Sequence, residues 1–302
     1  MVGCGAVGSL FAANLGTLEE VEVWAFDLSR EHVEAINRDG LRLTGAGEVV
    51  GKVNATTDPA ELPACDFGIV ATKAMHTDSA ISATAHAFAA GCVATVQNGI
   101  GNEEVLARHV ARVIRGTTFP AGKLIAPGVV QWDVKGDTTL GPFEPQPAPG
   151  AEIERLAEAA TRAGMPTHAV ADARGPQWRK VIFNAATNPL GALTGLTHGR
   201  VCGETPLRRL ASQLVEEGKA VASAQGIELD SDPEELIDFA ARPEVAYGHK
   251  ASMLQDVEAR RQTEVDFLNG GIVEFGRRYG VPTPGHEMIW ALVKGVEASW
   301  AH

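Results

Sequence analysis

The sequence has few of the features that mark membrane, nucleic-acid-binding or disulfide-rich proteins. Only four of its 302 residues are cysteines, and Cys4, Cys65, Cys92 and Cys202 lie far apart without a CxxC pair. Cysteines in this pattern are typical of reduced, buried side chains, so we expect neither a disulfide framework nor a metal site. The nine histidines contain no HxxxH pair, which also argues against a bound metal ion.

Long apolar runs and basic clusters are also missing. No apolar stretch approaches the about 18 residues of a membrane-spanning helix, and no charged segment precedes a signal-peptide core. The formal charge of −12, without a Lys/Arg cluster, argues against a nucleic-acid or membrane partner. We therefore expect a cytoplasmic, soluble globular protein with one large domain or two of ordinary size.

What the chain does contain is a glycine-rich start, in which Gly3, Gly5 and Gly8 match GxGxxG. In dinucleotide-binding folds the first glycine permits a tight turn, and the second lets the backbone approach the pyrophosphate. The third allows close packing of helix and strand. The pyrophosphate would lie at the amino end of a helix starting near Ala6. The predicted cofactor loop comprises Gly3, Cys4, Gly5, Ala6, Val7 and Gly8.

An acidic residue follows the next predicted strand. Residues 21–26 alternate like a strand and end at Asp27, which lies 19 residues after Gly8. An acid about 20 residues after the loop holds the ribose hydroxyls of such cofactors. A carboxylate repels the 2′-phosphate of NADPH, so Asp27 favours NADH, although Arg30 is near enough in sequence to meet a phosphate.

The first strand of this motif is short. Only Met1 and Val2 precede the first glycine, whereas a strand of ordinary length would supply about four more apolar residues. We expect either a stub in place of the first strand or a chain that lacks its natural start.

Two short apolar segments predict neighbouring parallel strands. Residues 66–73 and 92–99 are joined by a predicted crossover helix at 77–90, so their carboxyl ends should meet at one edge of the sheet. Ligands bind at that edge, which makes Lys73 and Asn98 candidate contacts. A surface lysine and a turn asparagine are the alternatives. Other elements are expected at 29–36, 40–43, 113–119, 128–134, 138–141, 152–163 and 165–170.

The second half is predicted to be helical, and its most informative helix spans Trp178 to Pro189. At about 100° per residue, Lys180, Asn184 and Asn188 fall on one stripe that drifts by only ~40° per step. The other faces are mostly apolar, so the helix should be buried. A buried ammonium and two amides are costly unless they face a wet cleft or a ligand. Alternatively, the lysine reaches the surface and the amides bond to nearby backbone.

A second polar interruption occurs in residues 252–269. The apolar spacing predicts one helix with a buried face in which Arg261 and Glu264 form an opposite-charge pair. That pair could be a structural ion pair. Ser252 and Gln255 likewise match a capping box at the start of the helix.

Together, these segments resemble the ketopantoate reductases (2-dehydropantoate 2-reductases). The shared motifs are GxGAxG, VATK, QNG, WRKxxxNxxxNPL and SMLQDVEARRQTEVDxLNG followed by GVPTP. They occur in the family's order over nearly the whole chain. The resemblance implies an α/β Rossmann-type dinucleotide-binding domain at 1–171 and an all-α domain at 172–302. It also implies NAD(P)H-dependent reduction of ketopantoate to D-pantoate in pantothenate synthesis.

The resemblance also implies roles for individual residues. Lys180 would be the general acid that protonates the ketone oxygen, with Glu264 as a second catalytic residue. The substrate and Lys180 would be bound or oriented by Asn98, Asn184, Asn188, Ser252 and Glu264. Lys73 would lie near cofactor and substrate, and Asn98 and Glu264 would also contact the cofactor. A carboxylate near Lys180 would keep the amine protonated.

Two positions depart from the family pattern. Many members have Asn–Gly where this chain has His198-Gly199, so His198 is a candidate substrate contact of altered chemistry. NADPH-using members commonly have Arg at the position of Asp27. The resemblance to the family therefore favours NADPH, whereas Asp27 itself favours NADH. These departures leave open another branched or aryl 2-oxo acid as substrate.

Alternative functions and the expected partners are also to be considered. A β-hydroxyacid dehydrogenase of the 6-phosphogluconate type likewise has a Rossmann domain followed by helices, but the motif SMLQD…TEVD…NG argues against this assignment. A non-enzymatic NADH-sensing protein is the other alternative. The expected partner is a small-molecule 2-oxo acid, and a homodimer is compatible with the sequence.

Overall fold

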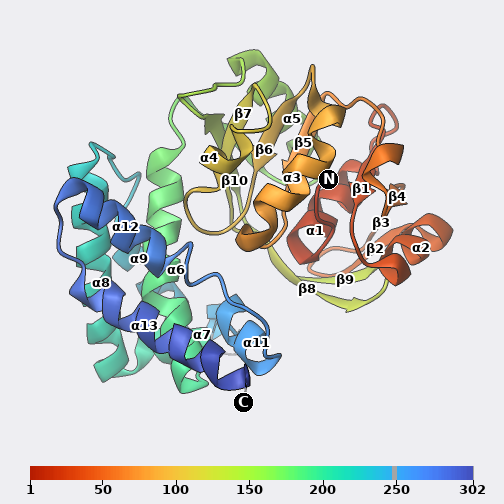
Figure 1. The fold of residues 1–302 in the computed structure, drawn as a ribbon. Helices are drawn as coiled ribbons and strands as arrows, with labels where there is room; N and C mark the ends of the chain where they lie inside the picture. The colour runs from red at the N-terminus through yellow and green to blue at the C-terminus, as the bar shows by residue number, and fades with distance from the viewer. Residues whose placement is uncertain (247–249, 302) are drawn as a thin grey trace. The chain divides into compact units, whose positions relative to one another are not determined.

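The computed structural model describes residues 1–246 and 250–301 and divides the chain into two compact units (Figure 1). The first contains Met1–Gln97 and Asn102–Ala173, and the second contains Asn98–Gly101 and everything from Arg174 onward. The predicted boundary lies between residues 171 and 172, whereas in the structure the helical unit begins at Arg174 and also includes Asn98–Gly101. Residues 247–249 and 302 of the predicted helical domain lie outside the described residues.

The first unit alternates strands and helices. Its helices are α1 (Ala6–Leu15), α2 (Arg30–Asp39), α3 (Thr77–Thr84), α4 (Asn102–Leu106) and α5 (Gly150–Arg162), with 3-10 turns η1 (Pro59–Glu61), η2 (Ala74–His76) and η3 (Ala85–Phe88). Its strands are β1 (Trp24–Phe26), β2 (Leu41–Gly45), β3 (Val49–Gly51), β4 (Asn54–Thr56), β5 (Phe67–Val70), β6 (Cys92–Thr95), β7 (Val113–Thr118), β8 (Ala121–Ala126), β9 (Val129–Val134), β10 (Thr138–Pro142) and β11 (Thr167–Ala169).

The main sheet has the strand order β11-β10-β7-β6-β5, and β1 and β4 form a parallel pair beside it. The predicted parallel pairing of the strands in 66–73 and 92–99 is confirmed, with Ile69 opposite Ala94. These two residues share one hydrophobic core with Leu10 of α1, whereas Val70 and Val93 point into the core beneath α3 and α4. Both faces of the sheet are therefore covered by helices, as expected for buried parallel strands.

The short first strand connects the two parts of this sheet. Val2 bridges Phe26 of β1 and Val70 of β5, both in parallel orientation, and is almost fully buried. The Val2 amide donates to the carbonyl of Ile69 at 2.9 Å, and the Ala71 amide donates to the carbonyl of Val2 at 2.9 Å. The strand positions the glycine loop at the carboxyl edge of the sheet.

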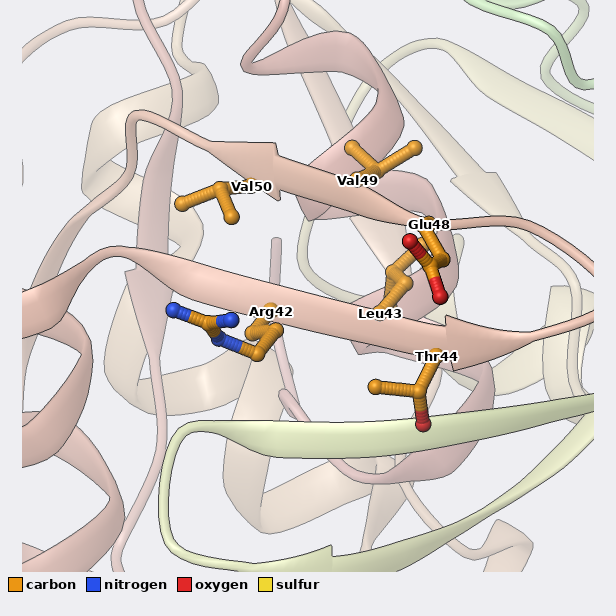
Figure 2. A pocket seen from close by; sticks show the side chains of 6 residues that line it. All are labelled: Arg42, Leu43, Thr44, Glu48, Val49 and Val50. Atoms are coloured by element: carbon orange, nitrogen blue, oxygen red, sulfur yellow. The ribbon is translucent and has the colours of Figure 1, made fainter.

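A second sheet was not predicted. It has the order β3-β2-β9-β8, and helix α1 packs on all four of its strands. Strand β8 escaped prediction because it lies at the edge and most of its residues are exposed, so it lacks the apolar alternation of a half-buried strand. Figure 2 shows a pocket on β2 and β3 of this sheet, and none of the predicted site residues line it.

The second unit consists of helices in its described part. They are α6 (Arg174–Thr194), α7 (His198–Gly203), α8 (Thr205–Ala224), α9 (Pro233–Ala240), α10 (Pro243–Ala246), α11 (Ser252–Glu258), α12 (Asn269–Tyr279) and α13 (Pro284–Ala298), with the 3-10 turn η4 (Ser299–Ala301). Helix α6 is central and packs against α7, α8, α9, α11 and α13 (Figure 1). The predicted fold class, a parallel α/β domain followed by a helical domain, is confirmed.

Helix α6 continues through Pro189 because another helix supplies the missing hydrogen bond. Proline has no N–H, so the carbonyl of Ala185 loses its helical donor. The side-chain amide of Asn269 donates to that carbonyl at 2.9 Å and also contacts Nδ1 of His286 at 3.0 Å. Nε2 of His286 donates to the carbonyl of Leu214 at 2.9 Å. Burial lowers the pKa of His286 to about 4, so the ring is neutral.

The single helix predicted for 252–269 is wrong. Helix α11 ends at Glu258, and Arg260 takes a left-handed conformation with φ of 49°. The Arg260 amide donates to the carbonyl of Val257 at 3.0 Å, and the Arg261 amide donates to that of Asp256 at 2.8 Å. This pair of bonds is a Schellman C-cap, with arginine at the usual glycine position. The apolar residues after this C-cap, such as Val265 and Leu268, are buried although their segment is not helical.

Two structural alternatives in this region are wrong as well. Arg261 is paired with Asp256 at 3.0 Å rather than with Glu264. The N-cap of α11 is Ala251, and no side chain caps that end, so Ser252 and Gln255 form no capping box. Ser252 therefore does not cap α11, and Glu264 is not the partner of Arg261.

Candidate active site

The candidate active site lies in the helical unit and centres on Lys180. Nζ of Lys180 donates to Oδ1 of Asn98 at 2.9 Å, although the two residues are 82 positions apart. Glu264 is 5% exposed and acts on Lys180 through its charge. Three residues that the sequence analysis selected from three separate segments are thus brought together.

The pKa of Lys180 reflects two opposing influences. Part of the side chain is exposed, but burial of the ammonium group favours the neutral amine and lowers the pKa from 10.5 to about 8. The negative charge of Glu264 opposes this effect and raises the pKa. The result is an amine that is largely protonated at neutral pH and gives up its proton more readily than a surface lysine. Such a group is suited to general acid chemistry.

The polar stripe predicted for α6 is present and buried. Asn184 is 8% exposed and Asn188 is 4% exposed, one and two turns beyond Lys180. The far end of the stripe approaches the start of α11, because a Cβ on Gly191 would lie 3.9 Å from that of Ala251. Ser252, half-buried, follows Ala251 directly. Helix α6 therefore presents a cation and two amides along one side, and the start of α11 lies near the end of that stripe.

His198 lies beside the same helix. Its ring stacks on Phe183 with a centroid separation of 5.1 Å and an interplanar angle of 21°, and the residue is 8% exposed. Phe183 lies three positions after Lys180 and is half-buried. The two rings form an aromatic wall at the side of α6, a feature that sequence reasoning missed because the partners lie on different helices.

Asn98 is placed by a loop that folds onto the helical unit. The amide of Ile100 donates to the carbonyl of Phe267 at 3.1 Å. Gly99 has φ of 88°, and a Cβ there would lie 2.7 Å from that of Phe267, so only glycine allows this approach. A Cβ on Gly271 would likewise approach Ile100 to 2.7 Å. The glycines of QNG and NGG thus dock the Asn98 loop against the segment that carries Glu264.

In the first unit, the glycine loop has the geometry that a dinucleotide requires. Gly3 has φ of 85°, and a Cβ on Gly8 would lie 2.0 Å from the carbonyl oxygen of Gly3. A Cβ on Gly5 would meet nothing within 4 Å, so the backbone faces open space at the N-cap of α1. The first amides of a helix lack intrahelical partners, and they attract anions. The residues present therefore fit a cofactor pyrophosphate.

Asp27 lies where the motif places it and is tied to the loop. Its Oδ2 accepts from the amide of Cys4 at 2.8 Å, and its Oδ1 accepts from the amide of Ser29 at 2.9 Å. Each carboxylate oxygen can accept a further hydrogen bond, and the side chain is half-buried. Asp27 thus joins the end of β1 to the glycine loop and remains able to accept two hydroxyl groups.

Lys73 follows β5 and is half-buried, in the same unit as the glycine loop. Next to it, Thr72 packs against Gly3, because a Cβ there would lie 2.6 Å from Cγ2 of Thr72. The side-chain amide of Gln97 donates to the carbonyl of Thr72 at 2.9 Å and to the hydroxyl of Thr77 at 2.8 Å. Gln97 therefore braces the loop edge, a role that sequence reasoning did not assign.

Other kinds of site find no support among the residues that the structure describes. Within 1–246 and 250–301 no group of three or more His, Cys, Asp or Glu side chains is placed to hold a metal ion. The same residues include no helix long and apolar enough to cross a membrane. All four cysteines are free, and burial raises the pKa of Cys4 to about 11. Cys65 is only half-buried, contrary to the prediction that all four are buried.

A glycine loop on a parallel α/β sheet and a half-buried lysine on a polar helical stripe are features of a nicotinamide-dependent oxidoreductase. Comparison with protein families agrees. The description "Ketopantoate reductase PanE/ApbA" matches residues 1–145, and "Ketopantoate reductase PanE/ApbA C terminal" matches residues 172–297. The chain belongs to the ketopantoate reductase family, as its motifs predicted.

Individual relatives extend over the same length. The 2-dehydropantoate 2-reductase of Pyrococcus abyssi is 36% identical over 304 residues, covering 99% of this chain and 97% of the relative. A PanE/ApbA family ketopantoate reductase from Ralstonia eutropha JMP134 superposes with a TM-score of 0.88 at 30% identity, covering 100% and 98%. D-mandelate dehydrogenase with NADH and anilino(oxo)acetate superposes with a TM-score of 0.91 at 27% identity, also covering 100% and 98%.

Proposed function

We propose that this protein is an NAD(P)H-dependent oxidoreductase that reduces ketopantoate to D-pantoate, with Lys180 as the general acid. The observation that carries the proposal is the cluster of half-buried Lys180 and Asn98 with buried Glu264 in a member of the ketopantoate reductase family. Membership supports the substrate, and the geometry supports the role of each side chain.

Lys180 acts on the ketone oxygen. A nicotinamide cofactor held at the glycine loop would supply a hydride to the ketone carbon, and negative charge would then develop on the ketone oxygen. An ammonium group facing that oxygen stabilises the charge and transfers a proton to it. Asn98 holds Nζ of Lys180 in place, and Glu264 keeps the amine protonated. Positive charge on Lys180 and the proton it donates are both needed, so turnover in the reductive direction should fall as the amine deprotonates.

Neutral side chains hold the rest of the substrate. Ketopantoate has a carboxylate, a ketone and a hydroxyl group, which need donors and acceptors rather than further charge. Asn184, Asn188 and Ser252 supply amide and hydroxyl groups along α6 and at the start of α11. Because the helices that carry them are packed together, these groups need little reordering when the substrate binds.

For the cofactor, we propose a preference for NADH. Asp27 stands at the end of β1 with a free lone pair on each oxygen, which suits the two ribose hydroxyls and repels a 2′-phosphate. The structural relative D-mandelate dehydrogenase carries NADH. Arg30 is exposed at the start of α2 and is the residue through which NADPH could be accepted. Lys73 and the amides of residues 5–8 would complete the cofactor contacts, while the amide of Cys4 is bonded to Asp27.

A second candidate substrate is an aryl 2-oxo acid. His198 stands where many family members have asparagine, and it stacks on Phe183 beside the polar stripe. A flat aromatic wall favours a ring-bearing substrate, because offset ring pairs contribute about 0.5–1.5 kcal/mol beyond their burial. The ligand in the D-mandelate dehydrogenase structure, anilino(oxo)acetate, is by its name an oxo acid with a phenyl group.

One panel of assays tests these proposals. Oxidation of NADH and of NADPH is followed with ketopantoate, 2-oxoisovalerate and an aryl pyruvate. We expect the highest kcat/KM with NADH and ketopantoate; a higher value with the aryl acid selects the second candidate, and a higher value with NADPH refutes the role given to Asp27. Lys180→Ala should lower turnover about a hundredfold to ten-thousandfold without weakening NADH binding. Near-normal turnover would remove Lys180 as the acid.

Two finer expectations belong with this function. NAD(P)H reductases need a compartment in which the cofactor is kept reduced, so we propose the cytoplasm as the site of action. We also propose a homodimer, which light scattering of the purified protein tests directly: a mass of one chain, 31.8 kDa, contradicts it.

A further inference from the structure

The segment that carries Glu264 has no regular secondary structure, and helix α13 holds it. Oε1 of Glu297 accepts two hydrogen bonds from Thr263, one from the backbone amide at 2.8 Å and one from the hydroxyl at 2.7 Å. Thr263 is completely buried, and Glu297 is 11% exposed at its side chain. Two bonds from one residue to a buried carboxylate fix the position directly before Glu264.

A second attachment follows directly after Glu264 and Val265. Asp266 accepts from the indole of Trp290 at 2.7 Å and from Nζ of Lys294 at 2.9 Å. Lys294 also lies 2.8 Å from Oε2 of Glu297, so its ammonium group joins the two attachments. Glu264 is thereby bracketed on both sides by residues bonded to one rigid helix, α13, which packs against α6.

The same segment carries two elements of the candidate site. Glu264 supplies the charge that acts on Lys180, and the carbonyl of Phe267 accepts the bond that docks the Asn98 loop. Within the segment, the amides of Phe267 and Leu268 bond back to the carbonyl of Glu264 at 3.0 and 3.1 Å. A shift of residues 263–266 would therefore displace both the charge on Lys180 and the hydrogen-bond acceptor of its ammonium group.

We propose that Glu297 is a positioning residue for catalysis: through Thr263, it holds Glu264 and the Asn98 loop against Lys180. The proposal rests on the proposed function, because it assigns Glu297 a part in the work of Lys180. Glu297 bonds to Thr263 and Lys294, and it acts by limiting where Glu264 can be. Loss of this restraint lets the irregular segment relax toward solvent, and small displacements of groups near a reacting centre lower rates steeply.

The test compares four variants that separate position from charge. Glu297→Ala removes the acceptor of both Thr263 bonds, whereas Glu297→Gln keeps an oxygen acceptor in the same place. Thr263→Val keeps the shape and loses the hydroxyl, which donates to Glu297 at 2.7 Å and accepts from the amide of Val265 at 3.3 Å. Glu287→Gln is the matched control, because Glu287 lies on the same helix but pairs at the surface with Arg277 at 3.1 Å. If Glu297→Ala does not fold, Thr263→Val and Glu297→Gln carry the test.

We expect Glu297→Ala to lower kcat about tenfold or more, with the KM for NADH unchanged. The upper limb of the pH–rate profile should move to lower pH, since Lys180 loses part of the influence of Glu264. Glu297→Gln should restore most of the wild-type rate, and Glu287→Gln should match wild type. The double variant Glu264→Gln/Glu297→Ala should have the same alkaline limb of the pH–rate profile as Glu264→Gln alone.

An opposite pattern would overturn the proposal. A Glu297→Ala variant that melts earlier but keeps the wild-type pH limb would show a purely structural role. A shift of the alkaline limb of the pH–rate profile that is equally large with Glu264 and with Gln at position 264 would also contradict the proposal. The pKa of Lys180 can also be followed by NMR of side-chain-labelled lysine, without any turnover. Should the chain reduce no 2-oxo acid, the proposed function fails, while a lowered Lys180 pKa in Glu297→Ala still supports the positioning role.

Discussion

Replacing Glu264 by glutamine removes one negative charge beside Lys180 and leaves the shape of the side chain nearly unchanged. The pKa of Lys180 is about 8, the balance of burial, which lowers it, and of Glu264, which raises it. Without the carboxylate only burial remains, so the pKa falls below 8. A neighbouring opposite charge shifts a pKa by about 1–3 units. In the proposed mechanism the reductive rate requires the protonated amine, so the rate should decline above that pKa.

The expected loss depends on pH. At pH 8 about half of the wild-type lysine is protonated; a fall of one unit would lower that fraction about fivefold, and a fall of two units about fiftyfold. At a pH well below both pKa values, the two proteins have the same protonated fraction. The variant should thus be impaired at pH 8 and recover on acidification toward pH 5–6. Its upper limb should lie at lower pH than that of wild type.

The measurement is kcat/KM against pH from 5 to 9.5 under saturating NADH. Glu258→Gln serves as the control, because Glu258 lies on the preceding helix, pairs with exposed Lys250 and should leave the profile unchanged. A loss for Glu264→Gln that stays constant over the whole pH range would refute the reasoning, since it would mean that Glu264 does not act through the charge of Lys180.

Three further predictions concern stability and cofactor binding. His286 binds a proton below about pH 6.5 when unfolded but only below about pH 4 when folded, so stability should fall by about 3 kcal/mol as the pH drops from 7 to 4. Urea unfolding of wild type and His286→Gln at several pH values should show this slope in wild type alone. Asn269→Leu leaves the carbonyl of Ala185 without a donor and should cost about 1–3 kcal/mol in the same assay, whereas an unchanged midpoint would contradict the bridging role. Gly5→Ala should fold normally and bind NADH more weakly, because its new Cβ meets no protein atom but enters the space proposed for the pyrophosphate. Gly8→Ala should instead lose about 1–3 kcal/mol of stability, and thermal melts with NADH fluorescence titrations separate the two outcomes.

Several features could be predicted from the sequence because they depend on local geometry. The glycine loop requires a positive φ at Gly3 and a close approach at Gly8, and few other residue types satisfy either demand. Ser29 accepts from the amide of His32 and caps α2, and serine is a preferred residue directly before a helix. The stripe of Lys180, Asn184 and Asn188 follows from helical periodicity alone. Each of these features needs only neighbours within a few turns.

The contacts that make the stripe a candidate active site are of another kind. Periodicity placed Arg261 and Glu264 on one helical face, but the C-cap at Arg260 ends α11 and separates them. At the end of that helix, the buried carboxylate of Asp256 is paired with Arg261. The spacing of apolar residues does not predict this contact. The second sheet was also missed, because its edge strands β3 and β8 are held by α1 and by the inner strands β2 and β9.

The sequence by itself thus determined a dinucleotide loop, a parallel sheet and a helix with one polar side. Local backbone geometry and side-chain periodicity are sufficient for these. Tertiary structure alone decided that Asn98 accepts from Lys180, that Glu264 acts on Lys180 and that Glu297 anchors Thr263. Each of these contacts joins residues at least 34 positions apart. They exist only because folding brings separate segments together and buries their charges, which lowers the pKa of Lys180 to about 8.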